Sequence, residues 1–163
     1  MCAADPPLSL ADLEIPRTPR QARALSEKIV AWLPDPLVVE TSQGPVTFVV
    51  EHGPRPAYSA LDPLGCTGTM LFPGDFRPYP RGLEYPDGWS LDDQRRAMAA
   101  LSDAWRDHPA QAGLLAAGRL LASYERCVYG GFDEDTPFAE IGAPVEDAVR
   151  RPLLVVAAEL GRE

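Results

Sequence analysis

Prolines in the middle of the chain restrict its fold more than any other feature of the sequence. Seven of the 18 prolines fall within residues 54–89: Pro54, Pro56, Pro63, Pro73, Pro78, Pro80 and Pro86. Because proline lacks a backbone N–H and clashes with the preceding helical turn, a long helix cannot run through this segment. Helices are therefore expected only on either side of it.

A helix is predicted before the proline-rich segment. Thr18 and Gln21 form a capping-box pattern, and Pro19 occupies the first helical position, where its missing N–H is not needed. The apolar residues of one stripe recur at spacings of three and four: Ala22, Leu25, Ile29 and Trp32. We expect a helix over residues 19–33.

Two short runs rich in β-branched residues follow this helix. Residues 37–41 and 46–51 flank a plausible turn, which predicts an antiparallel hairpin over residues 37–51. An isolated hairpin is only marginally stable in water, so the fold requires a third strand or a covering helix. Residues 69–72 are the best candidate for that strand.

Helical patterns return after the prolines. Ser90 is a suitable N-cap, and Asp92 and Asp93 follow it at the positive end of the helix dipole. A further helix is predicted over residues 110–129, because Gly130-Gly131 comes where a left-handed C-cap favours glycine.

The last part of the chain completes the predicted fold. Residues 145–151 and 152–160 are helical candidates divided by Pro152. We therefore expect a single α+β domain over residues 1–163, in which a small antiparallel sheet packs against four or five helices. Residues 1–15 are expected to form a loosely ordered N-terminal arm.

Composition argues against two classes of partner. The net charge of −9 disfavours nucleic acid, since proteins that bind the phosphate backbone need clustered Lys and Arg. Apolar runs are far shorter than the about 20 residues of a membrane span. The N-terminus lacks the pattern of a secretory signal, which favours a cytoplasmic location. One lysine against fourteen arginines is typical of a GC-rich bacterial genome.

The cysteines and histidines suggest an alternative function. Cys2, Cys66 and Cys127 are odd in number and far apart, which does not suit a disulfide framework. Cys66 lies between glycines and, with His52 as its base, could serve a small thiol-dependent enzyme. Cys127 is interpreted as a packing residue. No Cys or His pair has the spacing of a zinc site, and we expect neither metal nor cofactor.

Aromatic, arginine and acidic side chains favour a protein-binding function. Rigid aromatics and arginines lose little entropy on docking, and acidic side chains complement a basic partner surface. The candidate partner-binding residues are Phe76, Arg77, Tyr79, Arg81, Tyr85, Asp133, Glu134 and Asp135. The leading hypothesis is a protein–protein recognition module that acts as an accessory, regulatory or neutralising partner in a bacterial system. A small-molecule-binding domain is the other alternative.

Overall fold

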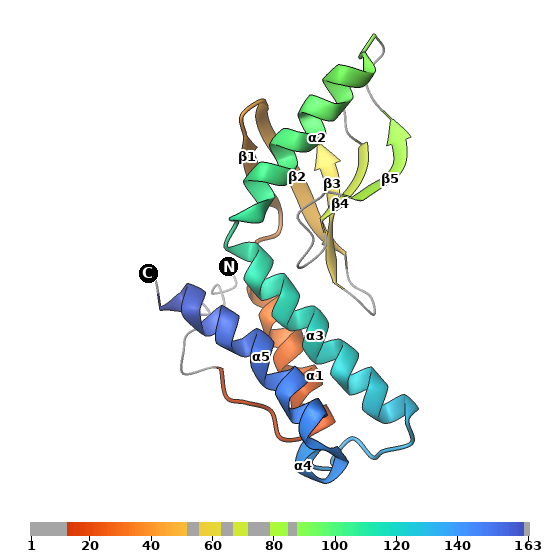
Figure 1. Ribbon diagram of the computed structural model, residues 1–163, viewed down its shortest axis with the longest axis vertical. Helices are drawn as coiled ribbons and strands as arrows, with labels where there is room; N and C mark the ends of the chain where they lie inside the picture. The colour runs from red at the N-terminus through yellow and green to blue at the C-terminus, as the bar shows by residue number, and fades with distance from the viewer. Residues whose placement is uncertain (1–12, 52–55, 63–66, 72–78, 85–87, 162–163) are drawn as a thin grey trace, which may run out of the picture. The chain divides into compact units, whose positions relative to one another are not determined.

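The computed structural model describes residues 13–51, 56–62, 67–71, 79–84 and 88–161 (Figure 1). Its elements in chain order are α1 (Pro19–Trp32), β1 (Leu37–Thr41), β2 (Gly44–Glu51), β3 (Ala57–Asp62), β4 (Thr67–Leu71), β5 (Tyr79–Glu84), α2 (Leu91–Arg106), α3 (Ala110–Tyr129), α4 (Phe138–Ile141) and α5 (Ala143–Leu160). The predicted α+β class is confirmed.

Contacts between residues divide the chain into two compact units. Unit 1 comprises residues 1–33 and 112–163, and unit 2 comprises residues 34–111. The helices α1, α4, α5 and nearly all of α3 belong to unit 1, whereas the sheet and α2 belong to unit 2. The expectation of one domain over residues 1–163 stays a prediction.

The start of α1 follows the predicted capping pattern with one difference. Thr18 Oγ1 accepts a hydrogen bond from the Gln21 N–H at 3.3 Å, as expected of an N-cap. The Gln21 side chain reaches one residue further back than in a standard capping box, because its Oε1 accepts the Arg17 N–H at 2.8 Å. The helix ends at Trp32, with Leu33 as its C-cap.

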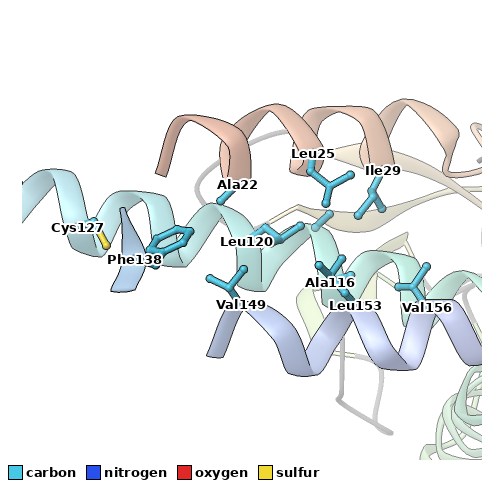
Figure 2. Close-up of a cluster of buried hydrophobic side chains, with 11 residues drawn as sticks. Ala22, Leu25, Ile29, Ala116, Leu120, Cys127, Phe138, Val149, Leu153 and Val156 are labelled. Atoms are coloured by element: carbon cyan, nitrogen blue, oxygen red, sulfur yellow. The ribbon is translucent and has the colours of Figure 1, made fainter. Parts of the chain in front are cut away.

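The core of unit 1 lies between α1, α3 and α5, with α4 at one end (Figure 2). Its buried members are Ala22, Leu25, Ile29, Ala116, Ala117, Leu120, Cys127, Phe138, Val149, Leu153 and Val156. The small residues of α3 allow α1 to approach closely. A Cβ on Gly113 would lie 2.9 Å from Leu33 Cδ2. The buried Ser26 hydroxyl also donates to the carbonyl of Ala117 at 2.7 Å. Leu13, from the expected N-terminal arm, packs against this core.

The helix α5 corrects the prediction of two helices divided by Pro152. It runs without interruption from Ala143 to Leu160, with Pro152 inside it. A proline inside a helix leaves the carbonyl four residues earlier without its usual donor. That residue, Ala148, is exposed, so water can satisfy its carbonyl. The side chain of Pro152 is buried, which favours the continuous helix despite the missing hydrogen bond.

Unit 2 contains a five-stranded antiparallel sheet with the strand order β1-β2-β3-β4-β5. The hairpin predicted over residues 37–51 is confirmed, with Leu37 paired to Phe48 and Thr41 to Gly44. The strand predicted at residues 69–72 is also present, as β4.

Two strands of this sheet were not expected. Apart from residues 69–72, the sequence pattern predicts no strand in the proline-rich segment, and this was wrong for β3 and β5. The β3 sequence lacks β-branched residues and therefore does not show the usual sequence pattern of a strand. The β5 sequence contains Pro80, which a central strand would not tolerate. However, β5 ends the strand order, and an edge strand accommodates proline.

The helix α2 contributes the other buried residues of unit 2. Ser90 and Asp93 form the capping box at its start, as the N-cap prediction required. Trp105 near its end is fully buried and meets the Tyr58 ring edge to face, with ring centroids 5.9 Å apart. The Tyr58 hydroxyl donates to the Pro34 carbonyl at 3.1 Å. The hydroxyl therefore keeps a partner, although burial raises the pKa of Tyr58.

The helices in the described part of the chain agree with the predicted absence of a membrane span. None of them combines the length and the apolar character that a bilayer crossing demands. The cytoplasmic location stays a prediction.

Candidate recognition surface

The end of α3 holds the chain in a fixed turn. The Phe132 N–H donates to the Cys127 carbonyl at 3.0 Å, and the Gly131 N–H donates to the Val128 carbonyl at 3.1 Å. These two bonds define a Schellman motif, in which the residue after the C-cap is left-handed. Gly131 fills that position with φ of 92°, so the predicted glycine cap is confirmed.

Two aromatic side chains extend from this turn into solvent. Tyr129, the last residue of α3, is 84% exposed, and Phe132 just after the turn is 43% exposed. The acidic residues Asp133, Glu134 and Asp135 follow directly. We refer to residues 129–135 as the aromatic–acidic segment. The two rings expose apolar area that a partner could bury favourably.

Arg20 joins the aromatic–acidic segment to the first turn of α1. Its Nε lies 2.9 Å from Asp135 Oδ1, and its Nη2 lies 3.0 Å from Glu134 Oε2. Its backbone N–H, which has no acceptor within the helix, donates to the Glu134 carbonyl at 2.9 Å. Both carboxylates thus lie at the positive end of the α1 dipole. We call these contacts the Arg20 clamp.

A second arginine extends the network along α1. The Arg23 guanidinium carbon lies 5.2 Å from the centre of the Tyr124 ring, and Arg23 Nη1 donates to the Tyr124 hydroxyl at 3.2 Å. That hydroxyl in turn donates to Glu134 Oε1. Glu134 therefore contacts both α1 and α3, and its position is fixed from two sides.

The Arg20 clamp changes the electrostatics of the acidic residues. The hydrogen bond from Arg20 lowers the pKa of Asp135, and the same contact raises the pKa of Arg20. Asp133 Oδ1 accepts the backbone N–H of Asp135 at 2.8 Å, which closes a local turn. The negative charge of Glu134 and Asp135 is thus partly offset within the protein. The exposed Asp133 forms no ion pair among the described residues, although its charge also raises the pKa of Arg20.

The remaining candidate residues lie in or next to the proline-rich segment. Phe76, Arg77 and Tyr85 lie outside the described residues, as do the alternative catalytic pair Cys66 and His52. Tyr79 and Arg81 belong to β5, where the backbone alone is described. Of the predicted site, the structure therefore brings together Asp133, Glu134 and Asp135.

Two further expectations concern Cys127 and metal binding. Cys127 is buried in the core of unit 1, in agreement with its interpretation as a packing residue, and burial raises the pKa of its thiol. Across the described ranges, no three His, Cys, Asp or Glu side chains are grouped to hold a metal ion. The acidic residues of the 129–135 segment are instead engaged by Arg20 and by backbone groups.

Sequence reasoning missed the aromatic part of this surface. The predicted helix over residues 110–129 includes Tyr129, but neither Tyr129 nor Phe132 is among the candidate partner-binding residues. The available pattern was an aromatic residue on each side of Gly130-Gly131. Because a glycine cap fixes the direction of the chain, side chains next to it are held in place, and this could have identified both rings.

No family model, curated protein or solved structure matches this chain. What the aromatic–acidic segment does must therefore follow from its own chemistry.

Proposed function

We propose that this chain is a protein-recognition module that docks through the aromatic–acidic segment. The observation that carries the proposal is the display of Tyr129 and Phe132 on a turn fixed by backbone hydrogen bonds. Aromatic residues dominate the energetics of protein interfaces because they bury a large area with few rotatable bonds. The fixed turn supplies them in an ordered position.

Preorganisation is the second support. Ordering a loop on binding opposes association, and a loop that is already held avoids this loss. The Arg20 clamp and the Schellman motif hold the two ends of the aromatic–acidic segment before any partner arrives. Glu134 and Asp135 thus contribute by positioning the segment in addition to their charge.

The charge of the chain suggests the chemistry of the partner. The chain carries a net charge of −9, and the exposed Asp133 lies next to Phe132. A basic protein surface would gain from long-range attraction to the chain and from contact with Asp133. The proposed role is that of an accessory, regulatory or neutralising partner in a bacterial system.

Photocrosslinking from defined positions tests the proposal. A photoreactive phenylalanine replaces Phe132 or Tyr129 in cells that express the chain natively, and the matched control carries the same residue at Leu154. Leu154 is 61% exposed on α5 of the same unit but lies outside the aromatic–acidic segment. We expect one discrete heteromeric product from positions 129 and 132 that the Leu154 probe does not form.

Affinity measurements with the crosslinked partner complete the test. Removing a central aromatic from an interface costs about 2 kcal/mol or more, or roughly a 30-fold loss of affinity. Phe132→Ala should show such a loss, Asp133→Lys should slow association, and Leu154→Ala should change affinity less than about twofold. Equal products from all three probe positions, or unchanged affinity of the Phe132→Ala variant, would contradict the proposal.

A further inference from the structure

Unit 1 contains a groove of about 1110 Å³ that is separate from the aromatic–acidic segment. It lies between the chain before α1, one face of α1, and residues of α4 and α5. Five charged side chains line it: Glu14, Arg17, Lys28, Glu146 and Arg150. The lining thus carries three cationic and two carboxylate side chains, and Lys28 has a further interaction within the protein.

Two arginines of the groove are available to a ligand. Within the part of the chain that the structure describes, neither the Arg17 nor the Arg150 guanidinium has a hydrogen-bond or ion-pair partner. Glu146 precedes Arg150 by four residues on α5, the favourable order for a helical ion pair. This pair is nevertheless not formed. Arg150 therefore keeps its five N–H donors for another acceptor.

Gln21 provides a third donor from α1. Its Oε1 accepts the Arg17 N–H at 2.8 Å, which fixes the orientation of the side-chain amide. The amide NH₂ group of Gln21 then has no acceptor among the described residues. Because Gln21 lines the groove, its free donor adds to the two guanidinium groups. All three groups are suited to a carboxylate.

The rest of the groove is apolar. Its lining includes Ile15, Pro16, Leu25 and Ala139, and Ile15 is 46% exposed. Sites for small organic molecules combine such apolar walls with a few polar groups that fix orientation, and the volume is comparable to the upper range of about 1,000 Å³. The groove therefore matches a ligand with both an apolar body and a negative group.

We propose that this groove binds a carboxylate on an apolar body, with the carboxylate at Arg17 and Arg150 and the body against Ile15 and Leu25. The guanidinium groups of Arg17 and Arg150 supply the charge complementarity. The carboxylate belongs either to a free organic acid or to the C-terminus of a peptide, and the two sources share this chemistry. Arg17 and Arg150 are more suitable than single ammonium groups because guanidinium can bind carboxylate in a bidentate manner.

Methyl NMR with octanoate as the probe tests the site. The chain has three isoleucines, Ile15 in the groove, Ile29 in the core and Ile141 in α4, so labelling of their δ1 methyl groups gives three signals. We expect saturable shifts that are largest at Ile15. Octanamide, which has the same chain without the charge, and acetate, which has the charge without the chain, should each bind at least tenfold more weakly.

Charge-matched variants locate the carboxylate. The double variant Arg17→Gln and Arg150→Gln should weaken octanoate binding at least tenfold. The control, Arg119→Gln with Arg151→Gln, removes two charges from exposed arginines of α3 and α5 that do not line the groove. It should change the affinity less than twofold. Equal effects of the two double variants would show a general charge effect and overturn the proposal.

The source of the carboxylate is settled by a second probe. The peptide acetyl-Ala-Leu-Leu is compared as the free acid and as the C-terminal amide. Tighter binding of octanoate identifies a free organic acid, whereas tighter binding of the peptide acid, lost on amidation, identifies a peptide C-terminus. If neither probe produces saturable shifts at Ile15, the groove is not a carboxylate site.

Discussion

The two compact units each contain a cluster that joins distant parts of the chain, and the two clusters use opposite physics. In unit 1, the Arg20 clamp lies in water, with the Arg20 and Asp135 side chains 61% and 64% exposed. In unit 2, the fully buried Trp105 contacts Tyr58 on one side and stacks on His108 at 5.7 Å on the other. The first cluster depends on charge, and the second on excluding water.

Because of this difference, we expect one cluster to position an exposed loop and the other to stabilise the fold. Exposed ion pairs contribute little to folding because water and salt screen them. They can nevertheless select one conformation of an exposed loop. Buried aromatic contacts contribute much more, since they remove a large apolar area from water. We therefore expect changes in the Arg20 clamp to affect the recognition surface, and changes around Trp105 to affect the fold.

The largest effect is expected for Trp105→Ala. Replacing a fully buried tryptophan removes its contacts with Tyr58 and His108 and leaves a cavity, which costs about 3–5 kcal/mol of the free energy of unfolding. Urea denaturation followed by circular dichroism measures this loss. Leu91→Ala, at a residue of the same helix that is 59% exposed, is the control.

The Leu91→Ala control should change the free energy of unfolding by less than about 0.5 kcal/mol. If Trp105→Ala is no more destabilising than this control, the aromatic cluster does not hold unit 2 together, and the contrast between the units is lost.

The sequence predicted the helices better than the sheet. Helix ends depend on local chemistry, and Thr18, Ser90 and Gly131 each indicated an end that the structure contains. The strands β3 and β5 depend on neighbours that are distant in sequence. Pro80 is compatible with a strand only because β5 ends the sheet, and a local pattern carries no information about that position.

Only part of the candidate site was predicted, because local sequence patterns do not show contacts between distant residues. Asp133, Glu134 and Asp135 are adjacent in sequence, so the sequence alone identifies them as a cluster. Arg20 and Asp135, which form one of the contacts, are 115 residues apart in the sequence, so no local pattern predicts it. The exposure of Tyr129 depends on which face of α3 packs against α1 and α5, which is a property of the tertiary structure.

A smaller effect, visible as a pH dependence, is expected at His108. Its Nδ1 accepts the Ala110 N–H at 3.1 Å, so the folded protein requires a neutral imidazole, and burial lowers the pKa of His108. The folded-state pKa is therefore below the unfolded value of about 6.5. The contribution of His108 to the free energy of unfolding is fully present above the unfolded-state pKa. This contribution decreases as the pH falls below that pKa, because the unfolded state then binds the proton more readily than the folded state.

The variant His108→Asn isolates this contribution. An asparagine oxygen can accept the same N–H without titrating, so the decrease in stability between pH 7.5 and pH 5 should be smaller in the variant than in the wild type. Urea denaturation at a series of pH values measures it. Identical pH profiles would show that the protonation of His108 does not change the free energy of unfolding.

The smallest effect on stability is expected for Arg20→Gln, although it should change the aromatic–acidic segment the most. Without the guanidinium, the pKa of Asp135 should rise towards its ordinary value, which side-chain NMR titration measures. In the wild type, the lowered pKa adds stability above the ordinary pKa of Asp, and this is lost as the pH falls through the folded-state value.

The free energy of unfolding near neutral pH should then decrease only slightly in the Arg20→Gln variant, and in 1 M salt the difference should shrink, because the Debye length falls to about 3 Å. The exchange of the Phe132 amide hydrogen should accelerate, since the loop loses one of its two anchors. Arg119→Gln, at an exposed arginine outside the clamp, is the control. A large loss of stability that persists in high salt would mean that the clamp supports the fold, and the separation of positioning from stability would not hold.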